Sequence, residues 1–358
     1  MLTRREMLAV MGCSAAIGPL SAQGVAFGRI DAHAHIHWSI PALIANMEKD
    51  NWRALSICVW EQFDNQPVDS DVGRFKTIDE LLAATAKVHR DSKGRIAWAG
   101  TIDARSFENR DFSEKTIATV QQCFKDGAIG IKIWKTIGMK IRGRSGEYLL
   151  PDNKALLPVY EAIQKADRTL IAHLAEPNGA WLPMDALDNV YAAYYKRNPQ
   201  WHMGNQPGAP AKETILQARD RVLAKFPKLR VVGAHLGSNE EDLGALAKRL
   251  DTYPNFGVDC CARIRHFFDG DRAANRQFLD RYQDRILYGS DWVRSKATDE
   301  AVAVAVLAQE NREWNLLARG GMQNLQNRQV EGLALPESML HKMFHDNARR
   351  WIPGIAPA

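Results

Sequence analysis

The sequence has no run of lysines and arginines, no repeated segment and no apolar stretch long enough to cross a membrane as a helix. Its 47 basic and 42 acidic residues leave a net charge of only +5 over 358 residues, and no aromatic stripe accompanies them. We therefore do not expect a nucleic-acid partner. The 46% hydrophobic and 25% charged residues are ordinary for a soluble globular protein.

Cysteine is scarce, with five residues in the chain, of which Cys13 lies in the first 24 residues. The four that remain are an even number, which in an exported protein raises the question of disulfides. Cys58 and Cys260, however, lie in apolar, strand-like runs, where a free cysteine acts as a small buried hydrophobe. We therefore expect free thiols, and none of the four has the spacing of a metal site.

The first 24 residues have the order of an export signal. Arg4 and Arg5 precede an apolar, alanine-rich stretch that ends in small residues near Ala22. The paired arginines resemble a twin-arginine (Tat) signal, which predicts export by the Tat machinery to the periplasm or beyond. A short amphipathic first helix is the alternative. Lipid anchoring at Cys13 is disfavoured, because Met11 is an unusual residue two places before a lipoprotein cysteine.

Eight apolar, strand-like runs recur along residues 25–358, with segments of helical periodicity between them. The runs cover residues 28–37, 55–60, 96–102, 129–134, 170–174, 229–235, 256–260 and 286–291. Nearly continuous apolar runs are typical of parallel strands that are buried on both faces. Eight alternations, ending in a helix near 337–351, predict one TIM-type (β/α)8 barrel domain. An open doubly wound sheet is the alternative, but no glycine-rich phosphate motif follows the first strand.

Two predicted connections are much longer than ordinary turns between a strand and a helix. They are residues 135–157, after the fourth strand, and 175–211, after the fifth. Both would emerge on the C-terminal face of the barrel, where this architecture binds substrate. We interpret them as pocket walls or a lid. The alternative is that the aromatic residues of the second loop bury a contact in a homo-oligomer.

Ionisable residues gather at the C-terminal ends of the predicted strands. They are His33, His35, Lys132, His173, His235, Asp259 and Asp291. On the first strand, Asp31, His33, His35 and His37 share one face, because strand side chains alternate. Neighbouring imidazoles can hold one metal ion. Since charges inside apolar strands are costly unless they are paired or coordinated, a metal site would explain them all.

Four motifs carry a resemblance to a known family. They are Asp31-x-His33-x-His35, His173, Gly233-Ala234-His235-Leu236-Gly237 and Gly289-Ser290-Asp291-Trp292. Their order and positions resemble the amidohydrolase superfamily. Within it they are most similar to the amidohydrolase-related (amidohydrolase 2) branch, which includes aminocarboxymuconate semialdehyde decarboxylase, resorcylate-type decarboxylases and lactone hydrolases. The match extends over nearly all of the chain after the signal, as far as residues 347–350.

The resemblance implies that His33, His35, His173 and Asp291 bind one divalent metal ion. Four nitrogen and oxygen ligands without a thiolate suit Zn²⁺, with Mn²⁺, Fe²⁺ and Co²⁺ as alternatives. His235 then becomes an acid/base or substrate-polarising residue. For His173 the alternative is a satisfied core histidine, and for His235 a position of tight packing between strand and helix. Asp31 could orient a histidine by a hydrogen bond.

Four further residues are expected in the substrate pocket, namely Lys132, Trp134, Arg263 and Arg265. Some relatives bridge two metals with a carboxylated lysine on the fourth strand. This branch commonly has the lysine without that role, so we expect one metal. The two arginines could anchor a substrate carboxylate through bidentate pairs. A solvated basic loop is the alternative for them.

The leading hypothesis is a metal-dependent hydrolase that cleaves a C–O or C–N bond of a small lactone, ester or amide. A metal-activated water would attack the carbonyl, and Asp291 or His235 would manage its proton. Non-oxidative decarboxylation is the first alternative, because Asp-x-His-x-His is shared by both reaction types. The second is an exported binding protein without turnover. That protein would be expected to lack a ligand or a base, and neither is missing here.

Overall fold

The computed structural model describes residues 27–60, 75–293 and 298–356. The predicted export signal, with Cys13, therefore lies outside the described residues. Among the helices that are described, none is both long enough and apolar enough to span a membrane. The cysteines of the described chain, Cys58, Cys123, Cys260 and Cys261, are free and buried.

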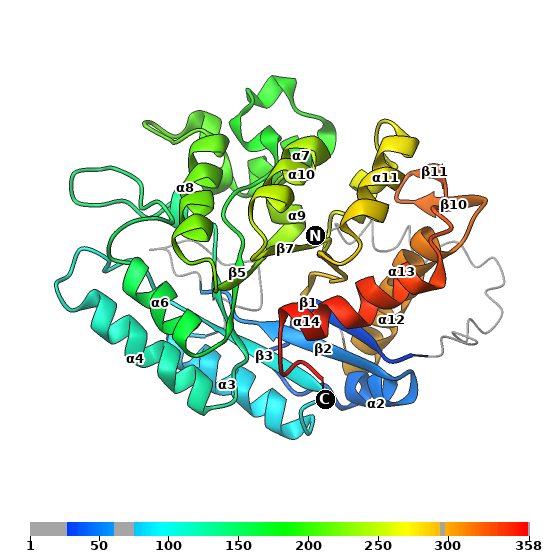
Figure 1. Cartoon of the computed structure of the whole chain (residues 1–358), viewed down its shortest axis with the longest axis horizontal. Helices are drawn as coiled ribbons and strands as arrows, with labels where there is room; N and C mark the ends of the chain where they lie inside the picture. Colours follow the sequence, from blue (N-terminus) through cyan, green and yellow to red (C-terminus); the bar gives the residue numbers. More distant parts are fainter. Residues whose placement is uncertain (1–26, 61–74, 294–297, 357–358) are drawn as a thin grey trace.

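The centre of the fold is a parallel sheet surrounded by helices (Figure 1). Its strands lie in chain order, from β1 to β8, with β9 beside β1. The strands are β1 Arg29–His35, β2 Trp52–Ile57, β3 Ile96–Thr101, β4 Gly130–Ile133, β5 Thr169–Ala172, β6 Arg230–Gly233, β7 Phe256–Asp259, β8 Ile286–Leu287 and β9 Trp292–Val293. The strands β1 to β8 each overlap a predicted apolar run. The predicted eighth strand contributes β8, and β9 follows directly after it.

The two short strands close the sheet into a barrel. β8 pairs with β7, and β9 pairs with β1. Between them, the amide of Ala32 donates to the carbonyl of Tyr288 at 2.9 Å, and the amide of Asp291 donates to the carbonyl of His33 at 2.8 Å. The last strand of the barrel thus meets the first. The TIM-type barrel is confirmed.

Helices cover the outside of the sheet (Figure 1). The longer ones are α2 Pro41–Lys49, α3 Ile78–Asp91, α4 Phe112–Lys125, α6 Leu157–Lys165, α8 Lys212–Lys225, α10 Leu243–Thr252, α11 Arg272–Tyr282 and α12 Asp299–Ala318. In α3 the hydroxyl of Thr77 accepts the amide of Glu80 at the N-terminus, and the residues Leu81 and Val88 are buried. A capped helix with one apolar face is what the periodicity predicts. A hairpin of β10 Met322–Leu325 and β11 Arg328–Glu331, which was not predicted, follows α12.

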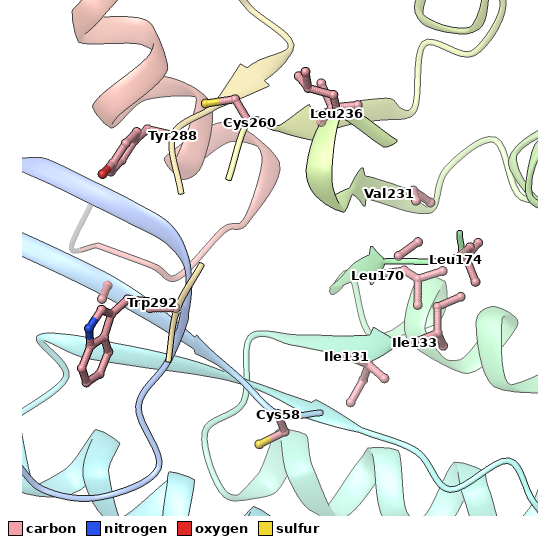
Figure 2. Close-up of a cluster of buried hydrophobic side chains, with 14 of the residues drawn as sticks. Cys58, Ile131, Ile133, Leu170, Leu174, Val231, Leu236, Cys260, Tyr288 and Trp292 are labelled. Carbon is pink, nitrogen blue, oxygen red and sulfur yellow. The ribbon is translucent and has the colours of Figure 1, made fainter. Parts of the chain in front are cut away.

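The closing helix is continuous but not uniform. α13 Glu337–His341 leads into a π-helical turn, Lys342–Asp346, and then into α14 Asn347–Trp351. Trp351 and Ile352 pack with residues such as Ile30 and Ala97 that point into the barrel. A second, larger apolar cluster lies outside the strands, and Figure 2 shows part of it. In most strands, one face packs in the inner cluster and the other face in the outer cluster, so the strands have nearly continuous apolar sequences.

Both long connections are present after β4 and β5. The second contains α7 Asn189–Arg197 and four 3-10 turns, η2 Asn178–Trp181, η3 Met184–Ala186, η4 Pro199–Trp201 and η5 Met203–Asn205. The two connections are joined by a buried ion pair between Lys135 and Glu176. The Lys135 ammonium also lies 4.2 Å from the ring centroid of Trp201. These contacts hold the second loop against the C-terminal end of β4.

Candidate active site and metal centre

Three predicted metal ligands converge where the barrel closes. Oδ1 of Asp291 lies 3.3 Å from Nε2 of His35 and 3.6 Å from Nε2 of His33. Asp291 adopts a left-handed backbone conformation, with φ of 56°, between β8 and β9. A Cβ on the nearby Gly289 would lie 2.7 Å from the Cβ of His33, so this turn requires glycine. The Gly-Ser-Asp motif therefore has a local steric reason.

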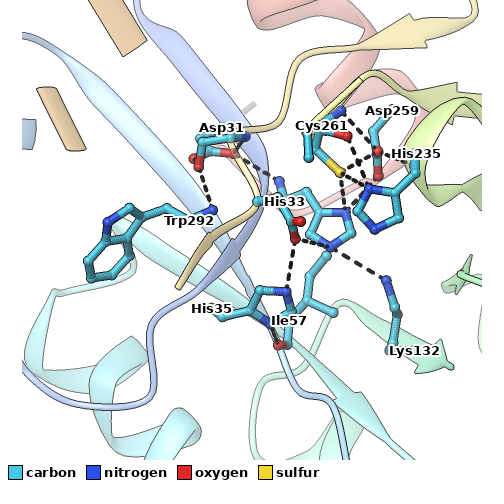
Figure 3. A network of polar contacts seen from close by, with 12 residues as sticks. Asp31, His33, His35, Ile57, Lys132, His235, Asp259, Cys261 and Trp292 are labelled. Atoms are coloured by element: carbon cyan, nitrogen blue, oxygen red, sulfur yellow. Dashed lines mark hydrogen bonds and ion pairs between the residues drawn. The ribbon is translucent and has the colours of Figure 1, made fainter. Parts of the chain in front are cut away.

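The other ring nitrogens of both histidines are anchored. Nδ1 of His33 donates to Oδ2 of Asp259 at 2.8 Å, and Nδ1 of His35 donates to the carbonyl of Ile57 at 2.8 Å (Figure 3). Since carboxylates and carbonyls only accept, both Nδ1 atoms carry the proton and both Nε2 atoms keep a lone pair. Metal-binding histidines are usually oriented in this way. The lone pairs are directed to the same carboxylate of Asp291.

Asp259 and Cys261 lie on the Nδ1 side of the His33 imidazole (Figure 3). Oδ1 of Asp259 accepts the amide of His235 and the thiol of Cys261, both at 2.8 Å. The sulfur lies 3.1 Å from Nδ1 of His33 and 3.3 Å from Nδ1 of His235. Burial opposes ionisation of Asp259, but the contact with His33 outweighs it and holds the pKa of this carboxyl below its usual range.

His235 and His173 lie face to edge, with ring centroids 4.2 Å apart. His235 follows β6 in a left-handed conformation, and its Nδ1 donates to the carbonyl of Cys261 at 3.0 Å. His173 is 7% exposed, and its Nε2 has no hydrogen-bond partner within the described chain. Burial, followed by the charges of His235 and Lys132, lowers the pKa of His173 well below 6.5. A neutral imidazole with an unpaired buried nitrogen is suited to a metal ion.

The donor set fits the divalent cation that the motifs imply. In the described chain, one group of potential ligand atoms within 4.8 Å of one another belongs to His33, His235, Cys261 and Asp291. It shares His33 and Asp291 with the predicted set. Cys261 and His235 belong to this group because both lie next to His33. His173 is outside it and packs against the ring of His235. Cys261 was missed, since neither its spacing nor the resemblance indicates a role.

Comparison with known proteins agrees with the motifs. A family model described as amidohydrolase matches residues 30–353. The chain belongs to the amidohydrolase family. This membership was predicted from the four motifs and is confirmed. Among curated proteins, none matches the chain significantly.

Solved structures show the same fold at low sequence identity. An uncharacterised TIM-barrel protein from Bordetella bronchiseptica is 14% identical, with a TM-score of 0.50 over 92% of this chain and 99% of that one. An amidohydrolase II structure has a TM-score of 0.51 at 14% identity, over 91% and 99% of the two chains. A 2,6-dihydroxybenzoate decarboxylase bound to 2,6-dihydroxybenzoate has a TM-score of 0.50 at 14% identity, with the same coverage.

Two charged residues contact His33 in this amidohydrolase, Lys132 at the imidazole ring and Asp31 at the backbone amide. Lys132 is fully buried, with its Nζ 3.5 Å from Nε2 of His33, and burial lowers its pKa. Asp31 accepts the backbone amide of His33 at 3.0 Å, together with the amide and the hydroxyl of Ser290. Burial raises the pKa of Asp31 to about 6. Asp31 thus positions the backbone of His33 and joins β1 to the closing turn, a contact different from the predicted one with a ring.

The remaining predicted pocket residues are more dispersed. Trp134 is half-buried, with its ring centroid 5.1 Å from that of Trp201 in the long loop. Arg263 pairs with the buried Glu240 at 3.3 Å. Arg265 donates to the hydroxyl of Tyr191 and lines a cavity of about 780 Å³ beside α10 and α11. Within the described chain, that lining includes neither His33 nor Asp291.

Proposed function

We propose that this amidohydrolase is a metal-dependent hydrolase that cleaves a C–O or C–N bond of a small lactone, ester or amide. The observation that carries the proposal is the convergence of Nε2 of His33 and Nε2 of His35 on Oδ1 of Asp291. We assign His173, with its unpaired buried nitrogen, as the fourth ligand. A divalent cation bound by these residues would polarise a carbonyl group and acidify a water molecule.

The proton chemistry falls to His235. Its Nδ1 donates to the carbonyl of Cys261, and a carbonyl cannot donate in return. The nitrogen that exchanges protons is therefore Nε2, which carries a lone pair in this tautomer. His235 would accept a proton from the attacking water and return it to the leaving group. Asp259 accepts hydrogen bonds from the backbone of His235 and from the ring of His33. The proposed base and a proposed metal ligand are therefore held at a fixed position relative to each other.

Cationic groups near the centre favour a substrate with a carboxylate. Lys132 is buried with its ammonium group against His33. Arg263 lies partly buried after β7 and is paired with Glu240. Arginine is well suited to bind a carboxylate through two parallel hydrogen bonds. We assign Arg263 and Lys132 to substrate binding, with Trp134 and the 175–211 loop as walls.

Decarboxylation is the second candidate. Lys132 favours it, because an ammonium that contacts a metal-ligand imidazole could hold the carboxylate that leaves as carbon dioxide. A structural neighbour is named as a 2,6-dihydroxybenzoate decarboxylase. In that reaction His235 would have to donate a proton to carbon, and its tautomer offers a lone pair at Nε2 instead. For this reason hydrolysis is placed first.

The test has two parts. The metal-loaded protein is given a panel of lactones, esters and amides, and acid release is compared with carbon dioxide release from hydroxybenzoates such as 2,6-dihydroxybenzoate. Acid release without carbon dioxide is expected, and carbon dioxide release alone would reverse the order of the two candidates. In parallel, metal content is measured for H173A and for the matched variant H235N. H173A should lose metal while staying folded. H235N should keep the metal and lose about 10²–10⁴-fold in turnover.

A further inference from the structure

A second group of possible ligands lies on the closing helix, away from the candidate centre. His341 ends α13, and His345 and Asp346 belong to the π-helical turn. Nδ1 of His341 lies 2.8 Å from Oδ2 of Asp346, and Nδ1 of His345 lies 2.9 Å from Oδ1 of the same carboxylate. The two imidazole centroids are 5.0 Å apart. One carboxylate therefore lies between two imidazoles.

This group lies at the opposite end of the barrel from the candidate centre. The ring of Phe27, two residues before β1, is 4.4 Å from that of His341. His35 is the last residue of β1. Because a strand rises about 3.3 Å per residue, roughly 20 Å separate the two ends of β1. Residues on the N-terminal face of such barrels serve stability, whereas catalytic groups lie on the C-terminal face.

The π-helical turn is what brings the three side chains together. In an α-helix a residue and its fifth successor point about 140° apart. Here the amide of Asn347 bonds to the carbonyl of Lys342, the spacing of a π-helix, which places residues five apart one turn from each other. Asp346, the fifth residue after His341, thereby reaches both imidazoles. Single π-helical turns are rare and occur frequently at functional sites.

The turn is held by contacts that do not involve the three side chains. The carbonyl of Met343 accepts the amide of Tyr288 at 2.8 Å. The side chain of Asn347 donates to the carbonyls of Gln283 and Ile286, both at 2.7 Å. The arrangement of the two histidines and Asp346 is thus set by the fold, and removing a histidine leaves the contacts that hold the turn.

We propose that His341, His345 and Asp346 bind a divalent transition-metal ion, with Cu²⁺ preferred over Zn²⁺. Two histidines four residues apart on one helix are a known zinc-binding arrangement, and Asp346 adds a carboxylate. Potential ligand atoms of all three lie within 4.8 Å of one another. The side chains are 37%, 20% and 50% exposed, so an ion can enter from solvent and water can fill its other positions. The preference follows the general affinity order of nitrogen and oxygen sites.

The bound ion would replace the ring protons that now connect the imidazoles to Asp346. It would link the end of α13 to the turn before α14, at the face where Phe27 leads into β1. Ions that bind only the folded state stabilise it. The site is therefore assigned a structural role, and it is independent of the reaction proposed for the C-terminal face.

The experiment compares the untagged, metal-stripped protein with the double variant H341Q/H345Q. Equilibrium dialysis against Zn²⁺, and then Cu²⁺, should show one more bound equivalent in the wild type than in the variant. Saturating Zn²⁺ should raise the melting temperature more in the wild type than in the variant. The difference between the two proteins carries the test, whether or not the C-terminal centre binds metal.

Two matched variants complete it. D346N should bind the extra ion at least tenfold more weakly, because it keeps the shape but loses the anionic ligand. H89Q, which removes a half-buried histidine elsewhere, should keep the full number of equivalents. Equal numbers of bound ions in the wild type and the double variant, with both folded by circular dichroism, would overturn the proposal.

Discussion

Asp259 accepts a hydrogen bond from Nδ1 of His33 at 2.8 Å, across 226 positions of the chain. The carboxylate ends β7 and the imidazole lies on β1, so the contact spans the interior of the barrel mouth. It fixes the tautomer of His33 and leaves the Nε2 lone pair directed toward Asp291. Within the described chain, Asp259 forms no hydrogen bond with His35, His173 or Asp291, so the candidate metal centre depends on a residue outside its proposed ligand set.

We expect D259N to weaken metal binding. An amide can donate as well as accept, so His33 could keep its proton on Nε2 and lose the lone pair that a metal requires. Loss of such an orienting group typically costs 10–100-fold in metal affinity. Equilibrium dialysis with Zn²⁺ measures it, and circular dichroism checks the fold. Unchanged affinity in a folded D259N protein would show that Asp259 does not set the tautomer.

The thiol of Cys261 offers a way to decide between the two overlapping donor sets. It donates to Asp259 and faces Nδ1 of His33, the side turned away from Asp291. We therefore expect C261S to bind metal within about threefold of the wild type, whereas H35A should lose it. In the Co²⁺-loaded wild type, absorption spectra should show no thiolate-to-metal charge-transfer band. Such a band, absent from C261S, would make Cys261 a ligand.

The sequence was sufficient for the barrel and for the positions of most candidate ligands at the ends of its strands, because both follow from local pattern. Apolar runs and the residues at their ends are visible along the chain, so the sequence predicts His33, His35, His235 and Asp291 at one mouth of the barrel. The roles of Asp259 and Cys261 could not be inferred, since they depend on which side of an imidazole each faces. Contacts of that kind join strands far apart in sequence. For the same reason, the hydrogen bonds that Asp31 accepts from the amide and the hydroxyl of Ser290 were not foreseen.

The π-helical turn was beyond sequence reasoning as well. Residues 337–351 have the apolar spacing of one continuous helix, and that helix is present. The π-helical turn changes the direction of the Asp346 side chain, and the apolar spacing along the sequence does not show it. The backbone hydrogen bonds reveal it, in particular the one from the amide of Asn347 to the carbonyl of Lys342.

The buried pair of Lys135 and Glu176 should be strongly coupled. Both side chains are less than 10% exposed, and Nζ of Lys135 also donates a hydrogen bond to the hydroxyl of Tyr194 at 3.2 Å. K135M leaves Glu176 buried without its cation, and breaking such a pair costs about 3–5 kcal/mol in unfolding free energy. In the double variant K135M/E176Q most of that loss should be recovered. Urea unfolding of both single variants and the double variant gives the coupling, and additive losses would contradict it.

Glu313 should make the folded state less stable as the pH rises. It lies on α12, where it accepts the hydroxyl of Tyr288 at 2.6 Å and the amide of Gln309 at 3.1 Å. Burial raises its pKa from 4.5 to about 7, the charge of Asp31 adds to the rise, and Arg312 opposes it. The folded protein thus keeps a proton that the unfolded chain releases above pH 4.5. Stability is lost between pH 4.5 and 7, and the loss is complete above that range.

The variant E313Q removes this dependence while keeping the shape of the side chain, and the hydroxyl of Tyr288 can accept as well as donate. At pH 8 we expect E313Q to be more stable than the wild type by about 1–2 kcal/mol, a value reduced because the side chain is partly exposed to water. At pH 4.5 the two proteins should differ by less than about 0.5 kcal/mol. Urea unfolding at both pH values measures the difference in unfolding free energy between the two proteins. The titration of all other groups is common to both proteins and cancels in this difference. A difference that stays constant, or shrinks, as the pH rises would mean that folding does not raise the pKa of Glu313 above its unfolded value.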